Sequence, residues 1–233
     1  MRRLVFPGLA LTSLLTVACG SSDPPPPTEE AQQQKTGNGT GGTTGSTTGT
    51  TVDYPKGPFA AVVGGVLRDA DFNALVSPVA DNFDMGKAKK LSFSDYYNPT
   101  SVDTKPRVLV ITEAGRWCAP CKDEAKASMG AYNAWNPDHS KPVVQFISLV
   151  IENTNYEPAV IEDASLWAKA YGLVYPVGID PSLKLGDFFD KSAIPFNMIV
   201  DTKTMTIVYA GTGGIELAPG TSGGDKIQAV LGN

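Results

Sequence analysis

Histidine and cysteine are scarce in this chain of 233 residues, which has one histidine and three cysteines. A structural zinc site needs four ligands, usually cysteines and histidines. A Cys-X-X-Cys pair could supply two of them, but the chain offers only His139 towards a second pair. Attachment of a c-type haem needs a histidine directly after a Cys-X-X-Cys pair, and Lys122 stands after Cys121. We therefore expect neither a zinc site nor a haem.

The chain also lacks an excess of basic charge. It has 19 lysines and arginines against 24 aspartates and glutamates, for a net charge of -5, and the basic residues form no cluster. Proteins that bind nucleic acids attract the phosphate backbone with a basic patch, so we expect no nucleic-acid partner. The apolar run at residues 4–17 is too short to span a bilayer comfortably.

The N-terminus has the features of an export signal. A charged start, Met1-Arg2-Arg3, precedes the apolar run. The sequence Thr16-Val17-Ala18-Cys19 is similar to a bacterial lipobox, which implies that residues 1–18 are a lipoprotein signal peptide and that Cys19 is lipidated. An ordinary cleaved signal peptide with a chance cysteine is the alternative.

Residues 19–55 have the composition of a disordered tether. Four prolines at 24–27 and a Gly/Thr/Ser tract at 36–51 provide nothing that could form a core. A flexible coil of this length spans roughly 30 Å on average. Residues 56–233 remain, enough for one domain with its own core. We expect a lipid-anchored domain held beside a membrane in the cell envelope or periplasm.

The central motif is Cys118-Ala119-Pro120-Cys121. Residues 107–112 are apolar and β-branched, which predicts a buried strand, and residues 123–135 predict a helix. Cys118 is thereby placed at a helix N-terminus, where unpaired backbone N–H groups and the helix dipole stabilise a thiolate. The spacing lets Cys121 close a disulfide across one turn, as expected of a dithiol/disulfide exchange centre.

The remaining patterns predict an α/β sheet covered by helices on both faces. Residues 143–150 predict a second buried strand, parallel to the first. The other predicted elements are a short strand with a turn at 62–69, a segment at 91–97 leading to the central strand, a helix at 161–171, a short strand or link at 175–179, a short helix at 183–189, an antiparallel hairpin at 196–201 and 204–209, and a closing helix at 225–231.

The sequence Trp117-Cys118-Ala119-Pro120-Cys121 after a buried strand resembles the active site of the thioredoxin superfamily. With the lipoprotein signal, the chain is most similar to the TlpA/ResA-type extracytoplasmic thiol-disulfide oxidoreductases (redoxin, AhpC/TSA-related). This resemblance implies a thioredoxin-like fold with a central mixed sheet. It also implies a membrane-anchored monomeric enzyme that exchanges electrons with protein disulfides, with its own disulfide in place of a cofactor. Because the Cys-X-X-Cys pair encloses no histidine, we favour a reductant, supplied with electrons by a membrane donor.

The resemblance also assigns roles to residues outside the motif. Pro195 corresponds to the cis-proline of the family, which implies that the Ile194 backbone pairs with a substrate strand. With Trp117, Pro195 is expected to form an apolar docking surface. Glu124 corresponds to a glutamate of ResA-like members and is expected to take a proton from Cys121. The alternative for Glu124 is a solvated position in the first helical turn.

The chain departs from the family pattern just before the motif. Thioredoxins keep a buried aspartate six residues before the first cysteine, where this chain has Thr112, which cannot act as a base. Glu113 is a possible substitute for this aspartate as the ionisable group, although its side chain should point to the opposite face of the strand from Thr112.

Two other functions remain open from the sequence. A peroxiredoxin-like thiol peroxidase needs a hydroxyl residue three positions before its nucleophile, and Gly115 stands there. A surface lipoprotein with a permanent, structural Cys118–Cys121 bridge is the non-enzymatic alternative, although structural bridges seldom close so short a loop.

Overall fold

The computed structural model describes residues 53–232. The predicted signal peptide, the lipidation site Cys19 and most of the tether lie outside the described residues. Within the part of the chain that is described, no helix is long and apolar enough to cross a membrane.

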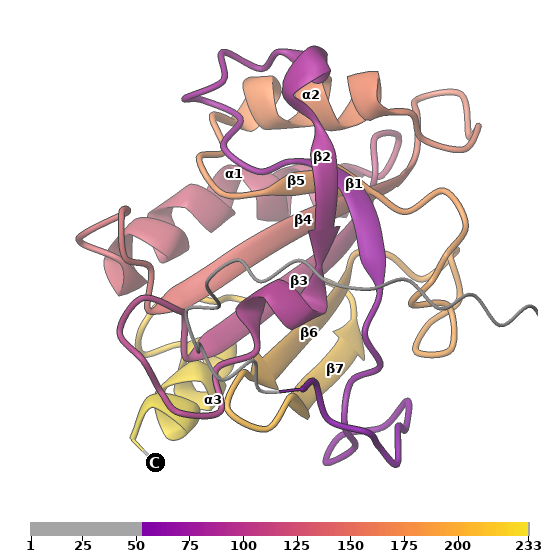
Figure 1. Ribbon diagram of the computed structural model, residues 1–233. Helices are drawn as coiled ribbons and strands as arrows, with labels where there is room; N and C mark the ends of the chain where they lie inside the picture. The colour runs from indigo at the N-terminus through magenta and orange to yellow at the C-terminus, as the bar shows by residue number, and fades with distance from the viewer. Residues whose placement is uncertain (1–52, 233) are drawn as a thin grey trace, which may run out of the picture. The chain divides into compact units, whose positions relative to one another are not determined.

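Seven strands form one mixed sheet in the order β2-β1-β5-β4-β3-β6-β7 (Figure 1). At its centre, β3 (Val108–Gly115) runs parallel to β4 (Val144–Glu152), as predicted, and antiparallel to β6 (Phe196–Asp201). The predicted C-terminal hairpin is formed by β6 and β7. The outer strands are β1 (Asp71–Leu75), β2 (Lys89–Ser92), β5 (Val177–Ile179) and β7 (Thr206–Thr212).

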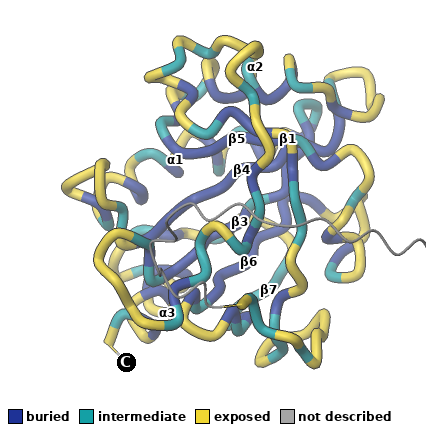
Figure 2. Tube along the Cα trace, viewed as in Figure 1, coloured by how far each residue is buried: buried dark blue, intermediate teal, exposed yellow. Residues whose placement is uncertain are grey.

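The two central strands are buried along almost their whole length. All nine residues of β4 are buried, and Thr112 is the one residue of β3 that is not. Because strand side chains alternate between the faces, both faces must be covered. Three helices contribute: α1 (Ala119–Trp135) packs on β4, α2 (Ile161–Tyr171) on β5 and β1, and α3 (Ser222–Leu231) on β3 and β6. Figure 2 shows the buried sheet surrounded by exposed loops. The predicted α/β fold is confirmed.

The helix ends follow from capping residues. The prediction for residues 161–171 agrees with α2. α1 begins four residues earlier than predicted, because Cys118 serves as its N-cap and Pro120 fits the first turn. α3 begins at Ser222 because the Thr221 hydroxyl accepts a hydrogen bond from the Gly224 N–H at 3.3 Å.

The predicted short helix at residues 183–189 is wrong, since this segment forms a series of turns. Leu183 has a φ of 52°, outside the right-handed helical region. The carboxylate of Asp180 accepts a backbone hydrogen bond from the residue four positions later at 2.6 Å, which favours a turn over a helix. Phe189 then stacks on Phe196 with ring centroids 4.6 Å apart. The segment is therefore held by side-chain packing and not by a helical backbone.

The predicted short strand at residues 62–69 is also wrong. This segment is mostly turn, with Gly64 at a φ of 88°, and its pairing is limited to isolated bridges at Val66. The N-terminal strand of the sheet is instead β1, which pairs with β2 and β5. The segment predicted at 91–97 contains the end of β2 and a short 3-10 helix, Phe93–Tyr96.

Candidate redox site

The Cys-X-X-Cys motif lies at the turn between β3 and α1. Cys118 and Cys121 form a disulfide with an S–S distance of 2.10 Å and a Cα–Cα distance of 5.3 Å. The Cys118 Sγ accepts a hydrogen bond from the Cys121 backbone N–H at 3.2 Å. In the reduced protein the same N–H group and the helix dipole would stabilise a Cys118 thiolate.

A third segment reaches the disulfide from the start of β6. The Ile194 carbonyl oxygen lies 3.7 Å from Cys118 Sγ. The Ile194–Pro195 peptide bond is cis, as predicted. Cys118 and Cys121 are each 2 % exposed. The structure thus brings together the predicted residues from positions 117–121 and 194–195, and it buries both sulfurs.

Two features decide the fold. The central parallel pair β3–β4 with the antiparallel pair β6–β7 is the thioredoxin strand arrangement, and the Cys-X-X-Cys pair lies at the start of the helix that follows the central strand. The fold is thioredoxin-like.

Comparisons with known proteins found similar structures and no similar sequences. No family model and no curated protein matches this chain. A candidate thiol:disulfide interchange protein DsbE from Chlorobium tepidum is 16% identical, with a TM-score of 0.49 and coverage of 73% of this chain and 98% of that chain. A secreted thiol-disulfide isomerase from Corynebacterium glutamicum is 18% identical, with a TM-score of 0.47 and coverage of 80% and 93%. A 2-Cys peroxiredoxin from Plasmodium vivax is 12% identical, with a TM-score of 0.49 and coverage of 73% and 94%. The assignment of the thioredoxin-like fold rests on its strand order and motif position.

Trp117 is held in place by residues that the sequence did not indicate. Its indole N–H donates to Glu152 Oε2 at 2.9 Å, and the other oxygen of Glu152 pairs with the Lys191 ammonium at 2.9 Å. The ring of Tyr156, a residue that is 65% exposed, lies 4.9 Å from the Trp117 ring. These partners are 35 to 74 positions away along the chain, so no local pattern could have identified them.

Gly115 lets the tryptophan approach the docking segment. A Cβ atom at this position would lie 2.9 Å from Ile194 Cδ1 and 2.9 Å from Trp117 Nε1. Real Cβ atoms do not come this close to other heavy atoms, so any side chain here would have to displace the side chains of Ile194 and Trp117.

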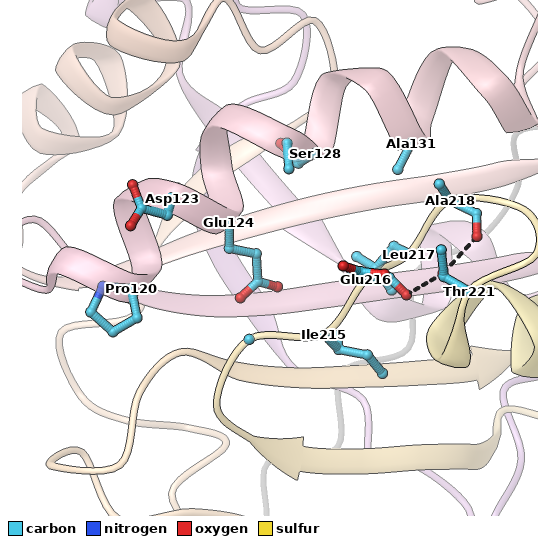
Figure 3. Close-up of a pocket in the computed structure, with 12 residues that line it drawn as sticks. Pro120, Asp123, Glu124, Ser128, Ala131, Ile215, Glu216, Leu217, Ala218 and Thr221 are labelled. Atoms are coloured by element: carbon cyan, nitrogen blue, oxygen red, sulfur yellow. Dashed lines mark hydrogen bonds between the residues drawn. The ribbon is translucent and has the colours of Figure 1, made fainter.

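Glu124 points into a cavity of about 580 Å³ between α1 and residues 214–221 (Figure 3). Both of its carboxylate oxygens are buried and have no hydrogen-bond partner in the part of the chain that is described. Burial raises the pKa of Glu124 to about 7, and the Asn197 side chain opposes this shift only in part. The carboxylate is therefore not a solvated group of the first turn, and it can bind and release a proton near neutral pH.

Thr112 and Glu113 lie on opposite faces of β3. The Thr112 hydroxyl donates to Asn197 Oδ1 at 3.1 Å. Glu113 shares the other face with Phe196, its partner in β6, and its oxygens have no hydrogen-bond partner among the described residues. Burial raises the pKa of Glu113 well above its ordinary value, and the nearby carboxyl of Asp180 raises it further. The predicted alternation of Glu113 away from Thr112 is confirmed, and burial disfavours the charged form of its carboxyl in the folded protein.

We predict that Glu113→Gln reduces the pH dependence of stability. The raised pKa means that the folded protein keeps a proton that the unfolded chain releases above the ordinary value of 4.5. Stability is therefore highest below pH 4.5 and falls as pH rises towards the folded-state pKa, by about 1.4 kcal/mol per pH unit for this one group. Urea unfolding from pH 5 to 9 measures the slope. Glu162→Gln, at an exposed site on α2, is the control and should keep the wild-type slope.

We predict that Gly115→Ala destabilises the fold by about 1–3 kcal/mol, because its Cβ must displace Trp117 and Ile194. Gly130→Ala in α1 is the matched control, since a Cβ there meets nothing within 4 Å. It should instead stabilise the protein by about 0.5–1 kcal/mol through helix propensity. Chemical denaturation measures both, and equal effects of the two substitutions would contradict the steric role of Gly115.

Proposed function

We propose that this protein is a membrane-anchored thiol-disulfide oxidoreductase that reduces protein disulfides outside the cytoplasm. The observation that carries the proposal is the Cys118–Cys121 disulfide in a thioredoxin-like fold, with Cys118 Sγ at the N-terminus of α1 and beside the Ile194 carbonyl. This arrangement supports a low-pKa nucleophile next to a backbone edge that can hold a substrate.

The reaction proceeds by two thiol-disulfide exchanges. The Cys118 thiolate attacks one sulfur of a substrate disulfide, forms a mixed disulfide and displaces the other substrate sulfur as a thiolate. Cys121 then attacks Cys118 Sγ, which restores the Cys118–Cys121 disulfide and releases the second substrate thiolate. The substrate gains two electrons and the protein loses two. A membrane electron donor must return them before another cycle.

Glu124 is proposed to accept the proton of Cys121 in the second exchange. Cys121 is 2 % exposed, so its thiol has little access to water. A carboxylate with a pKa of about 7 in the adjacent cavity is matched to proton transfer near neutral pH.

Substrate docking is proposed at Trp117, Ile194 and Pro195. The indole of Trp117 is fixed by Glu152 and Tyr156, which supports a rigid apolar surface beside the sulfurs. An extended substrate segment would pair with the Ile194 backbone.

Membrane anchoring is proposed from the sequence alone. A lipid on Cys19 and a tether at residues 19–55 would keep the domain in the cell envelope near its electron donor, and the domain is proposed to act as a monomer.

A permanent structural bridge is the second candidate, because both cysteines are almost fully buried. A peroxiredoxin-like activity is disfavoured, because Gly115 stands where such a site requires the hydroxyl of a threonine or serine.

We predict that the Cys118–Cys121 pair titrates at an accessible reduction potential. A potential of about -250 mV or lower supports a reductant, and one near -120 mV indicates an oxidant. Thiol alkylation and intact mass across redox buffers measure the value. Cys121→Ser should accumulate a mixed disulfide with a model protein disulfide, and Cys118→Ser should form none. A pair that no buffer reduces would establish a structural bridge.

We predict that Glu124→Gln slows the resolution of the mixed disulfide by about a hundredfold, the smaller end of general-base effects. Glu124 acts as a base only when it is deprotonated, so the wild-type rate should rise as pH increases through about 7. In the Glu124→Gln variant this rise should be absent. The rate of resolution should instead increase as the Cys121 thiol itself ionises, near pH 8.5 for an ordinary cysteine. Single-turnover release of the substrate thiol measures the rate. Glu162→Gln, at an exposed carboxylate on α2 outside this cavity, is the control and should keep the wild-type profile.

A further inference from the structure

A second, smaller cavity of about 210 Å³ borders the Cys-X-X-Cys motif. Arg116 and Lys122, which flank the motif, contribute to its wall. Thr154, from the segment after β4, and Trp167 and Tyr171, from α2, also line it. The cavity is therefore built from three separate parts of the chain, and two of its lining residues flank the motif in the sequence.

The wall of this cavity carries positive charge and no carboxylate. Arg116 Nη1 is 2.5 Å from Asp163 Oδ1, and the Asp163 side chain is only 6% exposed and lies outside the lining. The Arg116 side chain remains 23% exposed, and its guanidinium has further N–H donors. Within residues 53–232, Lys122 forms no ion pair and no side-chain hydrogen bond, so its charge is available to a ligand.

Trp167 adds a donor that lacks an acceptor. It is 3% exposed, and its indole Nε1 is buried without a hydrogen-bond partner in the described part of the chain. The other two tryptophans differ, because Trp117 donates to Glu152 and Trp135 to the Leu217 carbonyl. A buried indole N–H usually has a partner, since leaving it unpaired is unfavourable. The Trp167 N–H itself has almost no accessible surface, so the groups of the lining that favour an oxygen anion are the two cations, Arg116 and Lys122.

We propose that this cavity is a carboxylate subsite for the substrate, which rests on the proposed function. It would take the carboxylate of an acidic residue close to the substrate cysteine, through charge-assisted hydrogen bonds from Lys122 and Arg116. The cavity at Glu124 has the opposite character, because its wall carries Asp123, Glu124 and Glu216 and no basic residue. The two cavities together would orient an acidic substrate on the motif.

Three small disulfides of similar length test the charge preference of the full-length protein. They are 3,3′-dithiodipropionate, bis(2-hydroxyethyl) disulfide and cystamine, which are anionic, neutral and cationic. The second-order rate constant for oxidation of the reduced protein by each is measured at low salt. Each rate constant for a variant is divided by the wild-type value, which removes the intrinsic reactivity of the probe.

We expect Lys122→Gln to lower the rate with the anionic probe about threefold relative to the neutral one, and to raise the rate with the cationic probe by a similar factor, in the range for exposed charge pairs. High salt should remove the difference. Lys226→Gln is the matched control, an exposed lysine on α3 that lines neither cavity, and should leave the ratios unchanged. Equal effects of Lys122→Gln on all three probes would overturn the subsite while leaving the oxidoreductase intact.

A binding measurement tests the cavity without redox chemistry. The oxidised protein is titrated with 3-(methylthio)propionate, which cannot exchange sulfur, and with 3-(methylthio)propanol as the neutral control. We expect the Trp167 indole N–H resonance to shift with the acid and not with the alcohol. An unmoved Trp167 resonance at saturating acid, or an equal shift with the alcohol, would overturn the proposal. This result is independent of whether Cys118–Cys121 is redox-active.

Discussion

The pairing register of β3 with its two neighbours determines the whole redox site. In β4, Glu152 is the partner of Gly115, where β3 ends, and in β6, Phe196 is the partner of Glu113. The end of β4 and the start of β6 therefore meet the end of β3 at one edge of the sheet. This is why the motif, Glu152 and the Ile194–Pro195 segment come together although they are far apart along the chain. A shift of one residue in either pairing would turn these side chains to the other face.

Two buried glutamates show how different positions in the fold surround the same side chain. Burial raises the pKa of both Glu113 and Glu124, and neither has a hydrogen-bond partner in the described part of the chain. Glu124, in α1, lines a cavity whose wall also includes Pro120 of the motif. Glu113, in β3, is enclosed in the core on the face of Phe196. The position that is acidic in thioredoxins is here Thr112, hydrogen-bonded to Asn197.

The sequence indicated those parts of the structure that depend on local patterns. The strand at 107–112, the helix at 161–171 and the Cys-X-X-Cys turn have apolar periodicity or a helix-start signal within a few residues. Residues 183–189 look helical by the same criteria, but Leu183 adopts a positive φ and Phe189 packs on Phe196, which are effects of tertiary contacts. The resemblance to ResA-like proteins identified Glu124, whereas the cavity that it lines depends on residues 214–221. Glu152 and Trp167 carry no local signal, because their importance comes from partners brought to them by the sheet register.

The Glu152 carboxylate joins two parts of the docking surface that the backbone leaves separate. One oxygen holds Trp117 beside the motif, and the other holds Lys191 in the segment that leads to Pro195. The positions of the tryptophan and of this segment therefore both depend on one carboxylate. A change of the acid at the end of β4 would release both of its partners at once.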